Sequence, residues 1–306
     1  MKRRHLTPAL PECPQSWYLL GPSRMAPGEV RHFDFPQRSL AWYRSNESLP
    51  VVVNGHCPHM GVHLKHGTVV KDGLRCPLHH KVIDASCHPT VQSSVMYDML
   101  FAYLGDSPTH GPPQFRSDRP RRFVPGKSIH FEVPWYVPLV NAFDMSHLET
   151  IHQRQLTKEP TIQILNPWTY SISYTSHVCG GNWSDRMMAW LSGNEIHIYM
   201  ACHGGTTLIA ETVIGRYKTC MMMGFRPTET GVSLQPFYGI EGNGLRAWWA
   251  VRIAKYLFQS FLRKDIQILD GIRFRTDQLN EKDETLRRFL DFLFHLPFIE
   301  SKEVAI

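Results

Sequence analysis

Cys57-Pro58-His59 and Cys76-Pro77-Leu78-His79 are the two short stretches that decide the fold of this 306-residue chain, and sixteen residues lie between them. Together they present two thiol and two imidazole side chains, which are good ligands for transition metals. The prolines restrict the backbone beside the ligands, and Gly61 permits a tight turn after the first pair. The pattern therefore predicts two loops of one small domain that hold a common metal centre.

The ligand spacing favours an iron–sulfur cluster over zinc. A Rieske-type [2Fe–2S] centre has two cysteines on one iron and two histidines on the other, which raises its reduction potential above that of all-cysteine clusters. Zinc also binds cysteine and histidine, but zinc fingers usually place about two to four residues between paired ligands. Only one residue separates Cys57 from His59. We therefore predict that Cys57, His59, Cys76 and His79 hold a Rieske cluster, which transfers single electrons.

The composition is that of a globular protein, with 42% hydrophobic and 20% charged residues. No apolar run approaches the roughly 18 residues that cross a bilayer, and no apolar signal segment follows the basic N-terminus, so we expect a cytoplasmic protein without a membrane span. The net charge of +6 is dispersed, which argues against nucleic acid as a partner. Seven cysteines, an odd number, favour reduced thiols over a disulfide framework.

The distribution of turn residues divides the chain into two domains. Short apolar or alternating runs between Gly, Pro and Asn turns predict an all-β domain at residues 16–110, which contains both ligand stretches. Residues 111–127 are rich in Pro, Gly, Arg and Asp and are predicted to form a linker. Residues 128–306 mix expected strands and helices, so this part is predicted to be an α+β domain.

A second set of metal-ligating residues lies in the α+β domain. Asp144, His147 and His152 form the pattern D-x-x-H-x-x-x-x-H in a helix predicted at about residues 138–152. Asp144 and His147 share a helix face, but His152 lies about 140° from His147 on an ideal helix. Both imidazoles reach one metal only if the helix is distorted or ends nearby. Two histidines and one carboxylate would form the facial triad of a non-haem Fe(II) site.

The carboxylate of that triad is predicted on a long helix over residues 245–270. Its periodicity places Asp265 in the middle of an apolar stripe and Asp270 on the roughly opposite side. The stripe contains Ala254, Leu257, Phe258, Phe261, Ile268 and Leu269. A carboxylate on a buried face is costly unless it is paired or bound to a metal. Asp265 is therefore the candidate third ligand.

The order of these features, from Ser16 to Leu293, resembles that of the catalytic α subunits of the Rieske non-haem iron oxygenases. The resemblance rests on Ser16-Trp17-Tyr18-Leu19-Leu20-Gly21-Pro22, Cys57-Pro58-His59-Met60-Gly61, Cys76-Pro77-Leu78-His79, the Asp144/His147/His152 pattern and the helix with Asp265. One departure is His80-Lys81, where the family often has Gly-Trp. This departure leaves open whether the cluster surroundings or the subunit interface differ, and a degenerate oxygenase without activity is an alternative.

The resemblance implies a helix-grip catalytic domain with a large antiparallel sheet after the Rieske domain. It also implies a head-to-tail homotrimer, in which the cluster of one subunit approaches the iron of the next. Asp144 would then bridge His147 of its own subunit and His79 of the neighbouring subunit. Such a residue orients a ligand imidazole and couples the two centres.

The resemblance further implies a reaction with O2. An NAD(P)H-dependent reductase, with or without a ferredoxin, would reduce the cluster, which would pass electrons to Fe(II) held by His147, His152 and Asp265. The substrate would be hydroxylated or oxidatively demethylated. The chain is nearer in size to the single-subunit-type monooxygenases, demethylases and steroid-type hydroxylases, which favours monooxygenation. Aromatic-ring cis-dihydroxylation is one alternative, and a Rieske electron carrier without oxygenase activity is another, although a carrier would leave the pattern in residues 138–152 unexplained.

Methionine and aromatic residues predict a middle-sized, fairly apolar substrate. The candidates are Phe143, Met145, Trp183, Met187, Trp190, Met221–Met223, Phe237, Tyr238, Trp248 and Trp249. Such runs more often form ordinary core than a pocket, so ordinary core is the alternative for this set. No ion-pair site for a small carboxylate stands out in the sequence.

Overall fold

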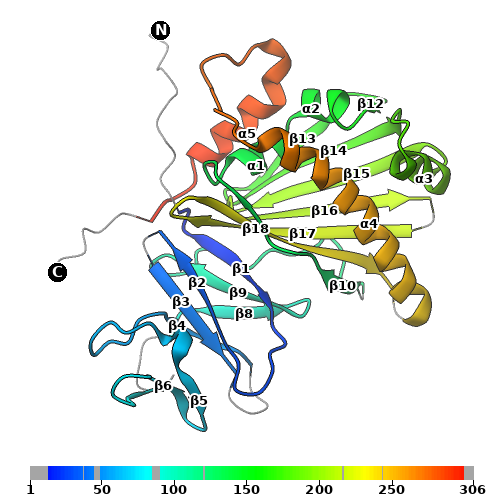
Figure 1. Cartoon of the computed structure of the whole chain (residues 1–306). Coiled ribbons are helices and arrows are strands. Elements are labelled where there is room, and N and C mark those ends of the chain that lie inside the picture. The colour runs from blue at the N-terminus through cyan, green and yellow to red at the C-terminus, as the bar shows by residue number, and fades with distance from the viewer. Residues whose placement is uncertain are drawn as a thin grey trace.

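The computed structural model describes residues 13–299, except positions 37, 45–48, 85–89, 120, 216 and 243. Figure 1 shows an all-β part built from the N-terminal strands and a larger part built on one wide sheet. The predicted α+β class, with an N-terminal β domain and a large antiparallel sheet, is confirmed. None of the helices among the described residues combines the length and hydropathy that a membrane-crossing segment requires.

The N-terminal part contains three antiparallel sheets of three strands each. They are β1 (Ser16–Pro22), β9 (Met99–Leu104) and β8 (Ser93–Met96); β2 (Val30–Phe35), β3 (Arg38–Tyr43) and β4 (Val51–Asn54); and β5 (Thr68–Val70), β6 (Gly73–Arg75) and β7 (Val82–Ile83). A 3₁₀ turn, η1 (Leu64–His66), precedes β5. The first predicted cluster loop follows β4, and the second lies between β6 and β7, so each loop follows a short strand as predicted.

The C-terminal part is built on nine antiparallel strands. Seven form the order β10-β18-β17-β16-β15-β14-β12, while β11 also pairs with β18 and β13 with β14. The strands are β10 (Arg121–Pro125), β11 (Ile129–Phe131), β12 (Arg154–Leu156), β13 (Thr161–Asn166), β14 (Thr169–Val178), β15 (Glu195–His203), β16 (Thr207–Ile214), β17 (Tyr217–Thr228) and β18 (Gly231–Glu241). Strand β10 comes from the predicted linker, residues 111–127, so part of that segment is a strand of the large sheet; the division of the chain into domains remains a prediction.

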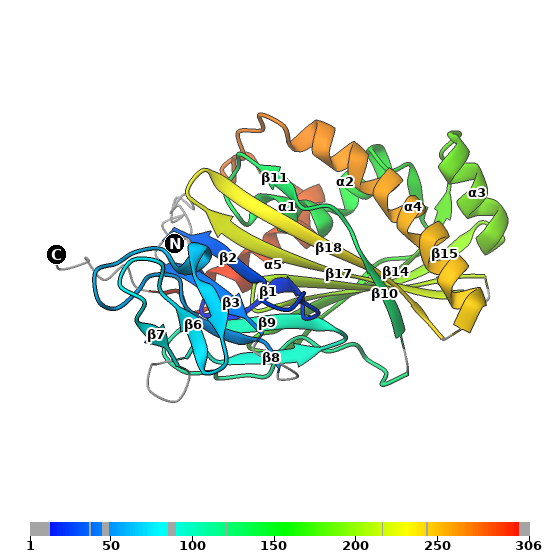
Figure 2. The ribbon, with the colours of Figure 1, turned by 60° about the horizontal axis from the view of Figure 1, so that its bottom comes forward.

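Strands β1 and β9 are buried on both faces because they lie between two cores. One set of their alternating side chains, including Tyr18, packs with β2–β4. The other set, including Leu19, packs against the large sheet through Cys220 and Met222 of β17. Since successive strand residues point to opposite faces, Met221 of β17 faces the other side of the large sheet, where helix α4 lies (Figure 2).

The helices are short except for one. They are α1 (Val137–Ala142), α2 (Met145–Thr150), α3 (Trp183–Ser192), α4 (Gly244–Leu269) and α5 (Glu284–Phe294), with a 3₁₀ turn, η2 (Glu281–Asp283), before α5. Helix α4 agrees with the helix predicted over residues 245–270. Its buried face includes Ala254, Leu257 and Asp265, but Ile268 is 38% exposed, so its place in the predicted stripe was wrong.

The single helix predicted at residues 138–152 was wrong, because two helices occupy this segment. Helix α1 ends at Ala142, and Asp144 takes an extended conformation and accepts a hydrogen bond from the backbone N–H of His147 as the N-cap of α2. An aspartate favours an N-cap over a helix interior because its side chain satisfies a free backbone donor. The break lets the backbone change direction just before the predicted metal ligands.

The packing of β1 on β17 leaves no room for a side chain at Gly224. A Cβ atom there would lie 2.7 Å from Cβ of Leu19, so we expect Gly224→Ala to lower the free energy of unfolding by about 1–3 kcal/mol through overpacking. Gly111→Ala is the control, since a Cβ atom at Gly111 meets nothing within 4 Å. Urea unfolding of both variants measures the difference, and equal midpoints for the two would contradict the close contact between the two parts.

Candidate metal centres

Two histidines and one carboxylate from separate elements meet at one point in the C-terminal part. Oδ1 of Asp265 lies 2.8 Å from Nε2 of His147 and 2.8 Å from Nε2 of His152. The two Nε2 atoms are 3.1 Å apart. Among the described residues this is the only group of three or more His, Cys, Asp and Glu side chains whose ligand atoms all lie within 4.8 Å of one another. The predicted triad residues are therefore brought together.

The ends of the short helix α2 position the two imidazoles. Asp144 caps its start, which fixes the turn that carries His147. The helix ends at Thr150, and Gln153, at φ 51°, takes the left-handed conformation just after His152. An ending helix was one of the two conditions under which both histidines could reach one metal. Asp265 approaches them from the buried face of α4.

The donor set and its spacing fit a mononuclear metal ion. Ligand atoms about 2.1 Å from a metal and at right angles to each other lie about 3 Å apart, close to the distances among these three atoms. Burial, opposed by the nearby carboxylate, lowers the pKa of His152. Burial raises the pKa of Asp265, but hydrogen bonds to His147 and His152 outweigh it and lower that pKa below its usual value. A neutral imidazole and an ionised carboxylate are the forms that bind metals.

Two further residues hold the triad, and the sequence patterns did not assign them this role. Nδ2 of Asn141, near the end of α1, lies 3.3 Å from both His147 Nε2 and Asp265 Oδ1. The ring of Phe261 stacks on His152 with 3.4 Å between centroids and 5° between planes. His152 Nδ1 is buried without a hydrogen-bond partner among the described residues, so the orientation of the ring is restrained by this stacking and by the contact of Nε2 with Asp265. Phe261 was predicted only as part of an apolar stripe.

An apolar cavity of about 80 Å³ adjoins the triad. A second cavity, of about 100 Å³, lies beyond it beneath α4. Both are bordered by Leu148, Tyr174, Met200, Met221 and Phe261. An apolar enclosure beside a metal site with open positions suits an organic substrate.

The predicted lining set was partly right. Met221 and Met223 border the triad cavity, whereas Trp183, Trp190 and Trp249 are 69%, 81% and 59% exposed, so their assignment to a pocket was wrong. The sequence missed Tyr174 and Met200. Both residues lie on strands in which apolar and polar residues alternate. The alternation shows that one face of each strand is buried, but it does not show which element covers that face.

The predicted cluster ligands lie together at the end of the N-terminal part. Cys57 and Cys76 are buried, while His59 and His79 are exposed with 4.9 Å between their ring centroids. A backbone hydrogen bond from Gly61 to Cys57 closes the first loop, and one from Cys76 to Lys81 closes the second. Two cysteines and two histidines are the ligand types of a Rieske centre, and the assignment of these four residues as its ligands stays a prediction.

The local backbone also favours a thiolate. Burial raises the pKa of the Cys76 thiol, but hydrogen bonds from the backbone N–H groups of Leu78 and His79 outweigh burial and lower that pKa. His80, which departs from the Gly-Trp that the family often has, comes directly after His79. It has φ 57°, a left-handed conformation that favours glycine. The backbone turn therefore keeps the shape that a glycine would give it, with an exposed imidazole added.

The two candidate metal sites are far apart within one chain. Figure 1 shows β5 and β6, beside which the cluster loops lie, at the opposite end of the molecule from α2. Asp144 borders the triad cavity and is half-buried, and its Oδ1 accepts a hydrogen bond from the backbone N–H of His147 at 3.1 Å. Its predicted bridge to a neighbouring subunit stays a prediction.

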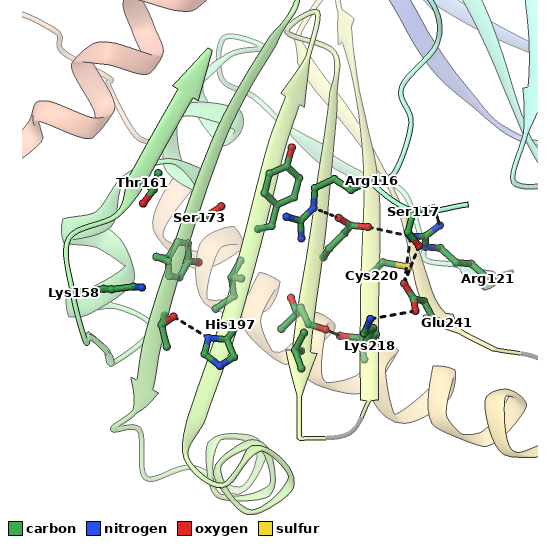
Figure 3. Close-up of a pocket in the computed structure, with 18 residues that line it drawn as sticks. Arg116, Ser117, Arg121, Lys158, Thr161, Ser173, His197, Lys218, Cys220 and Glu241 are labelled. Carbon is green, nitrogen blue, oxygen red and sulfur yellow. Dashed lines mark hydrogen bonds and ion pairs between the residues drawn. The ribbon is translucent and has the colours of Figure 1, made fainter. Parts of the chain in front are cut away.

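A larger polar cavity, of about 510 Å³, lies on the other face of the sheet (Figure 3). His197 and Tyr199 border it, whereas the intervening β15 side chain, Ile198, also borders the cavity beneath α4. Its two carboxylates are paired with basic side chains, since Arg121 lies 3.1 Å from Glu211 and 3.6 Å from Glu241. None of the triad residues borders this cavity, so we do not associate it with the metal site.

Comparisons with known proteins support a Rieske domain in the N-terminal part. Residues 16–94 match the Rieske [2Fe-2S] domain family. Cholesterol 7-desaturase from Xenopus laevis is 29% identical over 182 aligned residues, which cover 50% of this chain and 39% of that protein. The oxygenase component of chloroacetanilide N-alkylformylase from Rhizorhabdus wittichii is 23% identical over 148 residues, which cover 41% and 42% of the two chains. The alignments thus span about two fifths of these curated relatives.

The fold of the whole chain also has a counterpart among solved structures. The crystal structure of dicamba monooxygenase bound to dicamba superposes with a TM-score of 0.70 over 92% of this chain and 97% of that one, at 17% identity. The two proteins therefore share a fold that extends through both the N-terminal β part and the sheet that carries the triad.

The triad geometry predicts which carboxylate of α4 holds the metal. We expect Asp265→Asn to lose one iron, leaving about two of about three irons per chain, because the cluster keeps its own two. Asp270→Asn is the matched control, since Asp270 follows α4 and is exposed. Iron content and the paramagnetic resonance of the reduced cluster provide the two readouts. Retention of the third iron in Asp265→Asn, or its loss in Asp270→Asn, would refute the assignment.

Proposed function

We propose that this chain, which has a Rieske [2Fe–2S] domain and the fold of Rieske oxygenase catalytic subunits, is an oxygenase that hydroxylates or oxidatively demethylates an organic substrate with O2. The observation that carries the proposal is the convergence of His147, His152 and Asp265 beside an apolar cavity in a chain with that domain. A carrier protein would need no such triad. Two of the relatives are named for a desaturase and an N-alkylformylase, so single-site oxidation is favoured over aromatic-ring cis-dihydroxylation.

The ligand assignment follows from the residues. Cys57, His59, Cys76 and His79 would hold the [2Fe–2S] cluster, and His147, His152 and Asp265 a mononuclear Fe(II). The cluster supplies single electrons and the mononuclear iron supplies activation of O2. Three protein ligands on one side leave positions open for O2 and for a nearby substrate.

The remaining residues of the site orient groups and exclude water. Phe261 and Asn141 hold the triad side chains. Tyr174, Met200 and Met221 form the apolar wall beside them, and such a wall keeps water from competing for the site. The substrate would lie against this wall, in the cavity, with its oxidisable carbon toward the triad.

Electron supply is proposed to involve other chains. The separation of the two candidate centres within one chain supports a head-to-tail homotrimer in which the exposed imidazoles of His59 and His79 approach the triad of the next subunit. Asp144, at the edge of the triad cavity, would lie at that contact. Electrons would come from NAD(P)H through a reductase, with or without a ferredoxin, and a cytoplasmic location fits those donors.

Nitric oxide, which binds Fe(II) at open positions, tests the function without a known substrate. We expect anaerobic, dithionite-reduced protein to show a Rieske signal and, after addition of nitric oxide, a second paramagnetic signal from the mononuclear iron. His147→Ala should keep the first signal and lose the second. A full Rieske signal without a nitric oxide signal in the unchanged protein would instead favour an electron carrier, and bound zinc without a Rieske signal would contradict both.

Two substitutions at Asp144 distinguish the role of its negative charge from its role as the N-cap of α2. Asn is as good an N-cap as Asp, so Asp144→Asn should leave the unfolding free energy nearly unchanged, whereas Asp144→Ala should lower it by about 1 kcal/mol. We expect both to keep all iron and to slow oxidation of the reduced cluster after mixing with O2, followed by its visible absorbance. Unchanged rates in both variants would remove Asp144 from the electron path.

A further inference from the structure

The cavity beneath α4 has a polar end that the triad does not use. Most of its lining is apolar, from the sheet and from α4, and it continues past Phe261 to Met188 of α3. Arg154 of β12 and Ser176 of β14 also border it. Both are buried, at 3% and 0% exposure. Charged and hydroxyl side chains in an apolar cavity are costly unless they have partners.

Arg154 has an unused donor group. Its Nη2 donates to Oδ1 of Asp185 at 2.9 Å and lies 3.4 Å from the sulfur of Met188. Nη1, although buried, has no hydrogen-bond partner among the described residues. The ion pair with Asp185 thus uses only the Nη2 nitrogen of the guanidinium group. The planar group could bind a second oxygen through Nη1. A buried unsatisfied donor typically costs about 1–3 kcal/mol.

Ser176 supplies a second unused group beside the first. Its Oγ is buried and also without a partner among the described residues. Leu156 pairs with Ser176, and Arg154 pairs with Val178, in the register of β12 and β14. Arg154 and Ser176 are therefore diagonal neighbours on one face of the sheet, a separation that a long side chain spans. Two unpartnered polar groups on the same face of the sheet can serve one acceptor group of a ligand.

The local charge favours an anionic acceptor. Asp185 is the carboxylate that pairs with Arg154, and its other oxygen accepts a hydrogen bond from Asn182 and lies 3.6 Å from Nζ of Lys264. One carboxylate therefore faces two cations, which leaves one positive charge in excess. An additional carboxylate would balance that charge, whereas a neutral hydroxyl or amide would not.

We infer that Arg154 and Ser176 bind a carboxylate on the substrate, at the end of the cavity away from the metal. This inference rests on the proposed oxygenase function and specifies its substrate class, a middle-sized apolar carboxylic acid. Phe261 connects the two ends, because its ring stacks on His152 and lies 5.9 Å from the Arg154 guanidinium carbon. Anchoring the carboxylate at Arg154 would hold the apolar body along Phe261 and direct a fixed carbon toward the triad. The sequence alone indicated no such ion-pair site.

A matched pair of neutral and charged probes tests this anchor. 2-Naphthoate and 2-naphthamide have nearly the same shape and differ in charge, and calorimetry on the full, iron-loaded chain measures their dissociation constants without turnover. We expect naphthoate to bind at least about tenfold more tightly than naphthamide, since a tenfold ratio needs only about 1.4 kcal/mol. Arg154→Met, which keeps the length of the side chain, should abolish that preference, and Ser176→Ala should reduce it.

Arg116→Met is the control, because Arg116 is an exposed arginine paired with Glu211 at the polar cavity, and it should keep the full preference. If Arg154→Met does not fold, Ser176→Ala and Arg154→Lys provide the test, since Lys keeps the charge but not the second donor. Equal binding of both probes to the unchanged protein, or a preference that survives in Arg154→Met, would overturn the inference. A normal nitric oxide signal alongside that result would leave the proposed function standing.

Discussion

One ionised carboxylate on the buried face of α4 is the constraint on which the C-terminal part depends. Asp265 is 9% exposed, and an isolated charge at such a depth would be unstable by several kcal/mol. Two imidazoles at 2.8 Å compensate it, and these can arrive only because α2 ends between them. The long helix, the break at Asp144 and the turn at Gln153 therefore form one arrangement. Disturbing any of them would leave the buried carboxylate of Asp265 without its imidazole partners.

The sheet determines where this arrangement lies relative to the cluster loops. Strands β1 and β9 use both faces, one toward the β2–β4 core and one toward β17. The N-terminal part is thereby fixed to one face of the large sheet and α4 to the other. This layering protects the triad cavity from solvent, but it also puts the exposed imidazoles of the N-terminal part far from the triad. The proposed head-to-tail assembly would bring the two centres of neighbouring chains together.

The sequence predicted those features that depend on local spacing or on a strong period. The buried position of Asp265 follows from the period of a long helix, and the assignment of the cluster ligands, which rests on the one-residue gap between Cys57 and His59, stays a prediction. The break at Asp144 was not predicted, because an aspartate three residues before a histidine is compatible with a helix face as well as with an N-cap. The exposed tryptophans and the anchor at Arg154 depend on which elements pack together. Composition shows neither that α3 turns Trp190 outward nor that it brings Asp185 against β12.

Anomalous diffraction at the iron edge from crystals of the purified protein would place each iron among named side chains. We expect one iron between His147, His152 and Asp265 and two adjacent irons among Cys57, His59, Cys76 and His79. Iron at the four-residue site with none at the triad, in protein that retains its fold, would contradict the proposed oxygenase. A zinc signal at the four-residue site would contradict it as well.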